Sequence, residues 1–144
     1  MHKLEQVIYT GTATATGGRD GTAKSSDDRL QVNLSVPKAL GGDDGQGTNP
    51  EQMFAAGYSA CFIGALKHVA GAQKITLSSD ISVSADVSIG PIEKGFALAV
   101  KLTVDLADMD QQQAESLVAH AHEVCPYSNA TRGNIEVTLI TKTH

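Results

Sequence analysis

The sequence predicts an α+β fold with a mainly antiparallel sheet, and three observations predict it. Strand-like segments follow one another in hairpins instead of alternating singly with helices. Residues 49–71 are almost wholly apolar with helical character, and residues 110–125 form a second, amphipathic helical segment. The expected order is three strands, a helix, two strands, a helix and a strand. No repeat or linker divides the chain, so we expect a single domain over residues 1–144.

The part of the chain before the long helix carries strand patterns and a glycine-rich turn. Residues 6–16 predict a strand, and residues 30–36 alternate apolar and polar side chains until Pro37 ends a second one. Residues 17–21 (GGRDG) are typical of a hairpin turn with an exposed arginine. They do not match a phosphate-binding loop, because no lysine follows at the required offset. Residues 41–47 predict a flexible loop.

The helix over residues 49–71 is the centre of the predicted fold. The pair Asn49-Pro50 suits its cap and first turn, and Gly71 suits its end. A helix that is apolar on nearly every face is buried on nearly every side. One sheet covers only one side, so we expect a second copy of the chain to cover the rest in an extensive homodimer. Gly57 and Gly64 would let the helices approach closely.

The remaining segments predict a hairpin, a second helix and a closing strand. Residues 81–89 and 96–104 alternate apolar and polar side chains, and Gly90-Pro91 opens a turn between them. One face of this hairpin should lie on the core and the other should be largely polar. Asp110 is expected to cap the second helix, and residues 135–139 predict the last strand.

Composition excludes several classes of function. The chain has 11 basic and 16 acidic residues and a net charge of −5, so it lacks the basic surface that nucleic acids and anionic membranes require. No apolar run approaches the roughly 20 residues that span a bilayer, and the amino-terminal sequence lacks a signal-peptide core. We therefore expect a cytoplasmic protein. With two cysteines, no Cys-x-x-Cys pair and scattered histidines, we expect no metal site and no cofactor.

The two cysteines, Cys61 and Cys125, are the candidate reactive residues. A single cysteine on an apolar helix is usually a small core residue, and this ordinary explanation applies to each of them alone. Both lie on the inward face of their predicted helices, and the chain has no other thiol. We therefore expect the two side chains to meet, although a cytosolic pair is not expected to form a permanent structural disulfide.

A reactive thiolate at Cys61 would need a cation nearby. The start of its helix is about 11 residues away, so the helix dipole is too remote to help. Arg19, in the glycine-rich turn, is one candidate, although such an arginine is ordinarily solvated. His68, His122 and Arg132 are the others. Composition alone does not choose among these four residues.

Two long motifs carry a resemblance to a known family. Residues 47–62 (GTNPEQMFAAGYSACF) and residues 124–134 (VCPYSNATRGN) together resemble the organic hydroperoxide resistance proteins, the Ohr branch of the OsmC/Ohr superfamily. The resemblance extends over the whole chain. The segment after Cys125, residues 127–133 (YSNATRG), resembles the Ohr proteins more than the OsmC proteins. It implies an OsmC/Ohr-like α+β fold in which mainly antiparallel sheets wrap around central buried helices. It also implies an intertwined homodimer with both active sites at the subunit interface.

The same resemblance implies a bacterial thiol-dependent peroxidase that reduces organic hydroperoxides to alcohols. Cys61 matches the peroxidatic cysteine, which becomes a sulfenic acid, and Cys125 matches the resolving cysteine, which forms a disulfide with it. Arg19 and Glu51 match the arginine and glutamate that hold the reactive thiolate. The implied reductant is a dihydrolipoyl group on a lipoylated protein.

Helix geometry restricts how Glu51 acts. Glu51 and Cys61 are ten residues apart, which is roughly 15 Å along one straight helix, so the carboxylate cannot touch the sulfur of its own chain. Either Arg19 bridges this distance or the glutamate comes from the partner subunit. We favour the arrangement across the two subunits.

The expected substrate pocket is apolar, and two alternative functions stay open. Met53, Phe54 and Phe62 lie near the cysteine and should favour apolar hydroperoxides over hydrogen peroxide. One alternative is an OsmC-like peroxidase with another substrate or reductant, which substrate profiling would separate. The other is a non-enzymatic dimer that binds apolar ligands and has inert core cysteines, which predicts that peroxide induces no disulfide.

Overall fold

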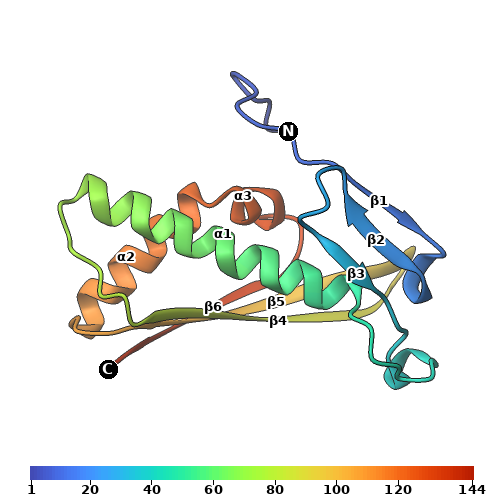
Figure 1. Ribbon diagram of the computed structural model, residues 1–144. Coiled ribbons are helices and arrows are strands. Elements are labelled where there is room, and N and C mark those ends of the chain that lie inside the picture. Colours follow the sequence, from blue (N-terminus) through green and yellow to red (C-terminus); the bar gives the residue numbers. More distant parts are fainter. The chain divides into compact units, whose positions relative to one another are not determined.

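The computed structural model describes residues 1–144, whose contacts divide into two compact units, Met1–Pro50 and Glu51–His144. Each unit contains one three-stranded sheet, and the long helices belong to the second unit. Figure 1 shows the elements of both. The predicted α+β class is confirmed. That residues 1–144 act as a single domain stays a proposal.

The first unit is a small antiparallel sheet with short helical turns. Its elements are β1 (Ala13–Thr16), η1 (Gly18–Asp20), β2 (Thr22–Ser25), β3 (Gln31–Asn33) and η2 (Lys38–Leu40). β2 is the central strand and pairs antiparallel with both neighbours. The glycine-rich turn, with η1 at its centre, joins β1 to β2, which confirms the predicted hairpin.

The strands of this unit are shorter than the sequence predicts. Of the strand expected over residues 6–16, only β1 is formed, and the apolar side chains of Val7, Ile8 and Tyr9 are exposed. The reason is the length of the partner strand. β2 offers only four residues to β1, and the chain bends after Ser25. Alternating side chains predict a strand only where another strand is present to accept its hydrogen bonds.

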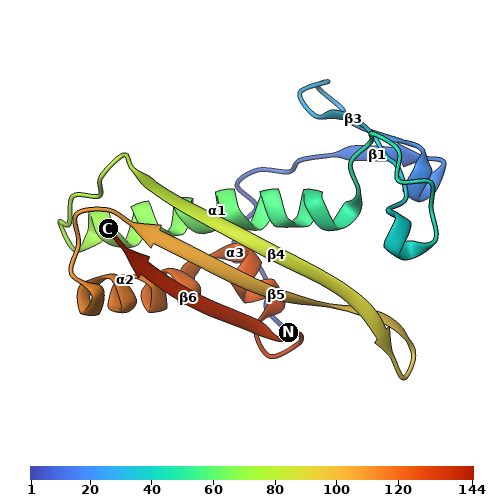
Figure 2. The same ribbon diagram turned by 90° about the horizontal axis from the view of Figure 1, so that it is seen from below.

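The second unit is a layer of helices on one face of a mixed sheet. Its elements are α1 (Pro50–Ala72), β4 (Ile81–Ile92), β5 (Gly95–Leu106), α2 (Gln111–Val124), α3 (Pro126–Thr131) and β6 (Val137–Thr143). Figures 1 and 2 show the three helices on the same side of the sheet. β4 and β5 form the predicted antiparallel hairpin, whereas β6 runs parallel to β5. A helical connection between β5 and β6 permits this parallel pairing.

The predicted position of the hairpin turn is wrong. β4 continues through Gly90-Pro91, which pair with Ala97 and Phe96, and the chain reverses only after Ile92. β4 is an edge strand, where proline is tolerated because its missing backbone N–H can fall on the side that has no partner strand. Gly95, at a φ of +90°, then starts β5.

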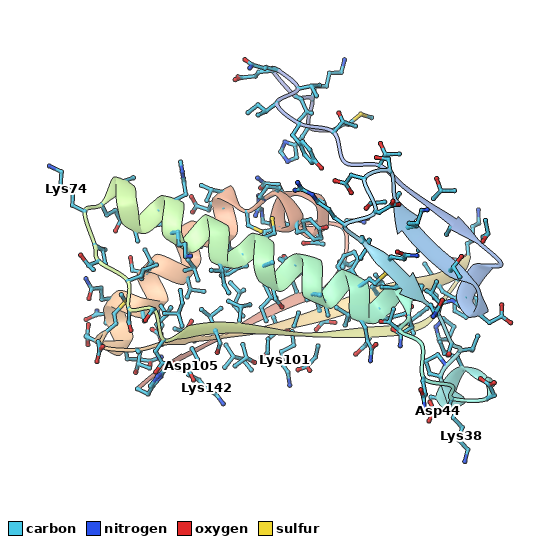
Figure 3. All side chains as sticks on the ribbon, viewed as in Figure 1. Lys38, Asp44, Lys74, Lys101, Asp105 and Lys142 are labelled. Atoms are coloured by element: carbon cyan, nitrogen blue, oxygen red, sulfur yellow. The ribbon has the colours of Figure 1, made fainter.

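The sheet separates an apolar face from a polar one, as predicted. On β5 the side chains of Val100, Leu102, Val104 and Leu106 are buried in the core. Figure 3 shows Lys101, Asp105 and Lys142 on the face away from the helices. The helices therefore pack on the apolar face, and the core of the second unit lies between the two layers.

Helix α1 begins and ends within one residue of its predicted bounds, but one chain buries only part of its surface. Its buried side chains are Tyr58, Phe62, Ala65, Leu66, Val69 and Ala70. Ala56, Ala60 and Gly64 follow one another at four-residue spacing and are exposed. A Cβ atom at Gly57 would lie 2.9 Å from the hydroxyl oxygen of Tyr127, so Gly57 makes room for this ring of the same chain. The expected homodimer stays a proposal.

Helix α2 has the predicted cap and leads directly into α3. The carboxylate of Asp110 accepts a hydrogen bond from the backbone N–H of Gln113 at 3.0 Å. α2 ends at Val124, and Cys125 is both the C-cap of α2 and the N-cap of α3. None of the helices in the structure combines the length and apolarity needed to cross a membrane.

His144 links two aspartates and should make stability depend on pH. Its ring nitrogens lie 2.9 Å from Asp80 Oδ2 and 2.7 Å from Asp105 Oδ1. The hydrogen bond to Asp80, then that to Asp105, raises the pKa of His144. Because the raised pKa belongs to the folded state, the stabilisation is complete below the unfolded value of about 6.5 and is lost as pH rises through the folded value.

We expect His144→Gln to lower the melting temperature at about pH 6 and to leave it nearly unchanged at about pH 9. The change should be small because these side chains are exposed. Thermal unfolding at both pH values in low salt measures it, with Asp80→Asn as a control that removes part of the same difference. An equal effect of His144→Gln at both pH values would contradict this assignment.

Candidate active site

The structure brings the two cysteines together. Cys61 is in the middle of α1, and Cys125 is at the junction of α2 and α3. The Cys125 thiol donates to the Cys61 sulfur with the two sulfur atoms 3.7 Å apart, and both cysteines are free thiols. A disulfide has an S–S length of about 2.05 Å, so this pair is in contact without being bonded. The catalytic roles of the two residues stay predictions.

The two thiols differ in accessibility. Cys125 has no exposed surface and belongs to the core of the second unit, whereas Cys61 is half-buried at the edge of that core. Part of Cys61 is therefore open to solvent within this chain, while Cys125 is covered. This asymmetry suits a pair in which one thiol reacts with an external molecule and the other reacts only with its neighbour.

The surroundings of Cys61 within the second unit oppose its ionisation. Burial raises the pKa of Cys61, and the adjacent Cys125 raises it further. A hydrogen bond from the backbone amide of Tyr127 acts in the other direction and lowers it. The net shift of the Cys61 pKa is upward, so a reactive thiolate needs a positive charge in addition to this amide.

Arg19 and Glu51 are placed by local structure in two different units. Arg19 is half-buried in η1, where the left-handed backbone of Gly17 and Gly18, at φ values of 76° and 70°, shapes the turn before it. Glu51 is half-buried in the first turn of α1, the same helix that carries Cys61. That the Arg19 guanidinium stabilises the Cys61 thiolate, and that Glu51 orients this guanidinium, stay predictions.

The other candidate cations have different surroundings. His68 is exposed on α1. Burial, and then the charge of Arg132, lower the pKa of His122, which favours its neutral form. Arg132 donates to the backbone carbonyl of His122 at 2.7 Å and to the side chain of Asn129. Its guanidinium is thus held at the α2–α3 junction.

The predicted substrate residues fall into two groups. Met53 and Phe54 are half-buried on α1, and the Phe54 ring packs edge-on against Tyr58 and Tyr127, with centroids 6.2 Å and 6.0 Å away. Phe62 has no exposed surface and packs in the core. Within this chain Phe62 can influence a ligand only through packing, whereas Met53 and Phe54 present accessible apolar surface.

Sequence reasoning missed a buried polar cluster that joins α1 to α3. The hydroxyl of Tyr58 lies 2.8 Å from Ser128 Oγ and 3.1 Å from Thr131 Oγ1. Ser128 Oγ in turn lies 2.8 Å from His122 Nδ1. The signal was present in the three-residue step from Ser128 to Thr131, which places these two side chains on one side of a helix.

Comparison with known proteins assigns the family. The family model described as OsmC-like protein matches residues 41–140. The chain is 56% identical to an organic hydroperoxide resistance protein of Xanthomonas axonopodis pv. citri (strain 306) over 139 residues, which cover 96% of this chain and 98% of the relative. This chain belongs to the Ohr branch of the OsmC-like family. The Ohr protein OhrB of Bacillus subtilis (strain 168) is 47% identical over 92% of this chain and 96% of its own length.

Solved structures of Ohr proteins have the same fold. An organic hydroperoxide resistance protein from Legionella pneumophila matches with a TM-score of 0.90 and 50% identity, over 95% of this chain and 99% of that one. One from Elizabethkingia anophelis matches with a TM-score of 0.91 and 47% identity, over 96% and 99%. The OsmC/Ohr-like fold expected from the two sequence motifs is therefore confirmed.

Proposed function

We propose that this Ohr-branch chain is a thiol-dependent peroxidase that reduces organic hydroperoxides to alcohols. The observation that supports this most is the pair of reduced sulfurs 3.7 Å apart, on one partly exposed and one fully buried residue. The relatives named organic hydroperoxide resistance proteins support the substrate class. The pair provides both thiols that a two-cysteine peroxidase cycle requires.

The first step oxidises Cys61. Its thiolate attacks the terminal oxygen of the hydroperoxide, an S–O bond forms and the O–O bond breaks. The alkoxide that leaves takes up a proton and departs as the alcohol. Cys61 becomes a sulfenic acid, and two electrons have passed from sulfur to the peroxide.

The second step uses Cys125. Its thiol gives up a proton and the sulfur attacks the Cys61 sulfur, so that an S–S bond forms while the S–O bond breaks and water leaves. The sulfurs must approach by roughly 1.7 Å from their 3.7 Å separation to reach disulfide length. An external dithiol of the dihydrolipoyl type then reduces the disulfide by thiol exchange and restores both thiols.

Arg19 is proposed to supply the positive charge that Cys61 needs, and Glu51 is proposed to orient it. A guanidinium beside the sulfur would lower the pKa of Cys61, against the upward shift caused by burial, and would donate hydrogen bonds to the peroxide. A carboxylate can orient that guanidinium through two parallel hydrogen bonds. Since α1 carries both Glu51 and Cys61 with roughly 15 Å between them, either Arg19 bridges the distance or the glutamate is Glu51 of the partner subunit.

The proposal includes a homodimer in the cytoplasm that works without metal or cofactor. Ala56, Ala60 and Gly64 form an exposed row of small residues on α1, a helix with few polar side chains. A second copy of the chain is the simplest cover for this row. The redox cycle uses only two thiols and an external dithiol, so its chemistry asks for no further group.

A substrate comparison tests the proposed function. With dihydrolipoamide as the reductant, we expect kcat/KM for cumene hydroperoxide to exceed that for hydrogen peroxide by at least about tenfold, because Met53 and Phe54 offer accessible apolar surface on the helix that carries Cys61. Alcohol and water formation are measured against reductant consumption. Hydrogen peroxide as the better substrate would contradict the substrate class, and no turnover with either peroxide would favour a non-enzymatic binding protein.

A further inference from the structure

We propose that the buried hydroxyl groups of Tyr58, Ser128 and Thr131 position Cys125 for disulfide formation. We term this cluster the hydroxyl network. Two of its members, Tyr58 and Ser128, are three residues along the chain from Cys61 and Cys125, and the proposal gives the network no part in the reaction of Cys61 with the peroxide. The inference rests on the proposed peroxidase function. It assigns Tyr58 and Ser128 as positioning residues for the second step alone.

The hydroxyl network and the sulfur pair form two parallel links between the same two segments. Tyr58 precedes Cys61 by three residues on α1, and Ser128 follows Cys125 by three residues in α3. One link is the 3.7 Å contact between the sulfurs, and the other is the 2.8 Å hydrogen bond between Tyr58 Oη and Ser128 Oγ. Tyr58 and Cys61 lie on one side of α1, and Cys125, the N-cap of α3, is joined to Ser128 by the first turn of that helix. The second link therefore restrains the distance across which the first must close.

The polar atoms of the hydroxyl network have partners in a mutually consistent pattern. Thr131 donates its hydroxyl to the carbonyl of Ser128 at 3.3 Å, which leaves Thr131 Oγ1 able to accept from Tyr58 at 3.1 Å. Tyr58 Oη then accepts from the Ser128 hydroxyl at 2.8 Å, and Ser128 Oγ in turn accepts from the Nδ1–H of His122 at 2.8 Å. Burial and Arg132 lower the pKa of His122 and favour its neutral form, which can carry its one proton on Nδ1. No buried side-chain oxygen or nitrogen lacks a partner. Fully satisfied buried networks of this kind are rigid and specify one arrangement.

The network extends to both sides of Cys125. His122, on α2, is held through its carbonyl by the Arg132 guanidinium at 2.7 Å. Ser128, on α3, is held by Tyr58 of α1. Cys125 lies between these two anchors at the end of one helix and the start of a six-residue one. A short helix has little stability of its own, so its position depends on such tertiary contacts.

Position matters here because two reactions compete for the Cys61 sulfenic acid. Attack by Cys125 gives the disulfide and water, while a second hydroperoxide molecule oxidises the sulfenic acid to a sulfinic acid and leaves as alcohol. The second outcome is irreversible without a dedicated repair enzyme. Holding the Cys125 sulfur within roughly 1.7 Å of bonding distance favours the disulfide, and small displacements of reacting atoms can cost up to about a hundredfold in rate.

Tyr58→Phe tests the inference, because it removes the hydroxyl and keeps the ring that packs against Phe54 and Tyr127. In rapid-mixing experiments with one equivalent of cumene hydroperoxide, we expect oxidation of Cys61 at the wild-type rate. Disulfide formation should slow by about tenfold, with more sulfenic acid trapped by dimedone and more sulfinic acid at excess peroxide. Ser128→Ala should slow disulfide formation to a similar extent. The double variant should form the disulfide no more slowly than either single variant, because both substitutions break the same hydrogen bond.

Val69→Ala is the matched control for a general loss of stability. Val69 is buried in α1, two turns beyond Cys61, and its truncation should destabilise the fold without slowing the disulfide step. The inference is overturned if Tyr58→Phe and Ser128→Ala form the disulfide at the wild-type rate, or if Val69→Ala slows it equally. If Cys61 of the wild-type chain is not oxidised at all, the proposed peroxidase function fails instead. Thermal melts establish whether each variant is folded. If Tyr58→Phe or Ser128→Ala does not fold, Thr131→Val, whose side chain has nearly the same shape as threonine, takes its place in the test.

Discussion

Replacing Cys61 with serine is expected to reduce hydroperoxide turnover by at least about a thousandfold. A serine hydroxyl is nearly the same size as the thiol, but it is not ionised near neutral pH and cannot form a sulfenic acid. Cys61 is the accessible member of the sulfur pair, so no other thiol of the chain can replace it. Consumption of cumene hydroperoxide in the presence of dihydrolipoamide measures the loss.

The control for this variant is its folding. Cys61 is half-buried, and the serine substitution changes little volume, so the melting temperature should stay close to that of the wild type. A folded Cys61→Ser protein that still reduces hydroperoxides at more than a few per cent of the wild-type rate would remove Cys61 from the mechanism. It would also favour the alternative in which the cysteines are inert.

Replacing Cys125 with serine is expected to stop the reaction at the sulfenic acid. The first step needs only the Cys61 thiolate, so one equivalent of hydroperoxide should still be consumed rapidly. Without a neighbouring thiol at 3.7 Å no internal disulfide can form, and excess peroxide should drive Cys61 to the sulfinic acid. Mass spectrometry should show added oxygen on Cys61 where the wild-type chain loses two hydrogens.

The Cys125→Ser variant also separates the two cysteines by role. Because Cys125 is fully buried, the single-turnover rate of peroxide consumption should be nearly unchanged in this variant and should vanish in Cys61→Ser. Equal loss of the first step in both variants would mean that the two sulfurs do not have distinct roles.

The spacing of apolar residues predicted the long helix and the long strands well, because each of them keeps one helical or strand-like spacing over many positions. α1 emerged within one residue of its expected bounds, and the β4–β5 hairpin formed as expected except that its turn lies later than Gly90-Pro91. The strand over residues 6–12 and the direction of β6 could not be read in this way. Both depend on which strand is available as a partner, and side-chain alternation contains no such information.

The candidate site was predicted in part for a similar reason. Two cysteines on inward helix faces indicate that they can meet, and the structure places their sulfurs in contact. The hydroxyl network was missed because a serine or threonine after a cysteine is ordinarily a surface or cap residue. Only tertiary packing shows that Ser128 is fully buried against Tyr58. The roles of Arg19 and Glu51 rest on the family motif and stay predictions.

Mass spectrometry of the wild-type chain after one equivalent of cumene hydroperoxide tests the central claim most directly. The account predicts the loss of two hydrogens, located by peptide mapping to a bond between Cys61 and Cys125, and reversal by dihydrolipoamide. An unchanged mass, or oxygen added to Cys61 with Cys125 still a free thiol, would contradict it.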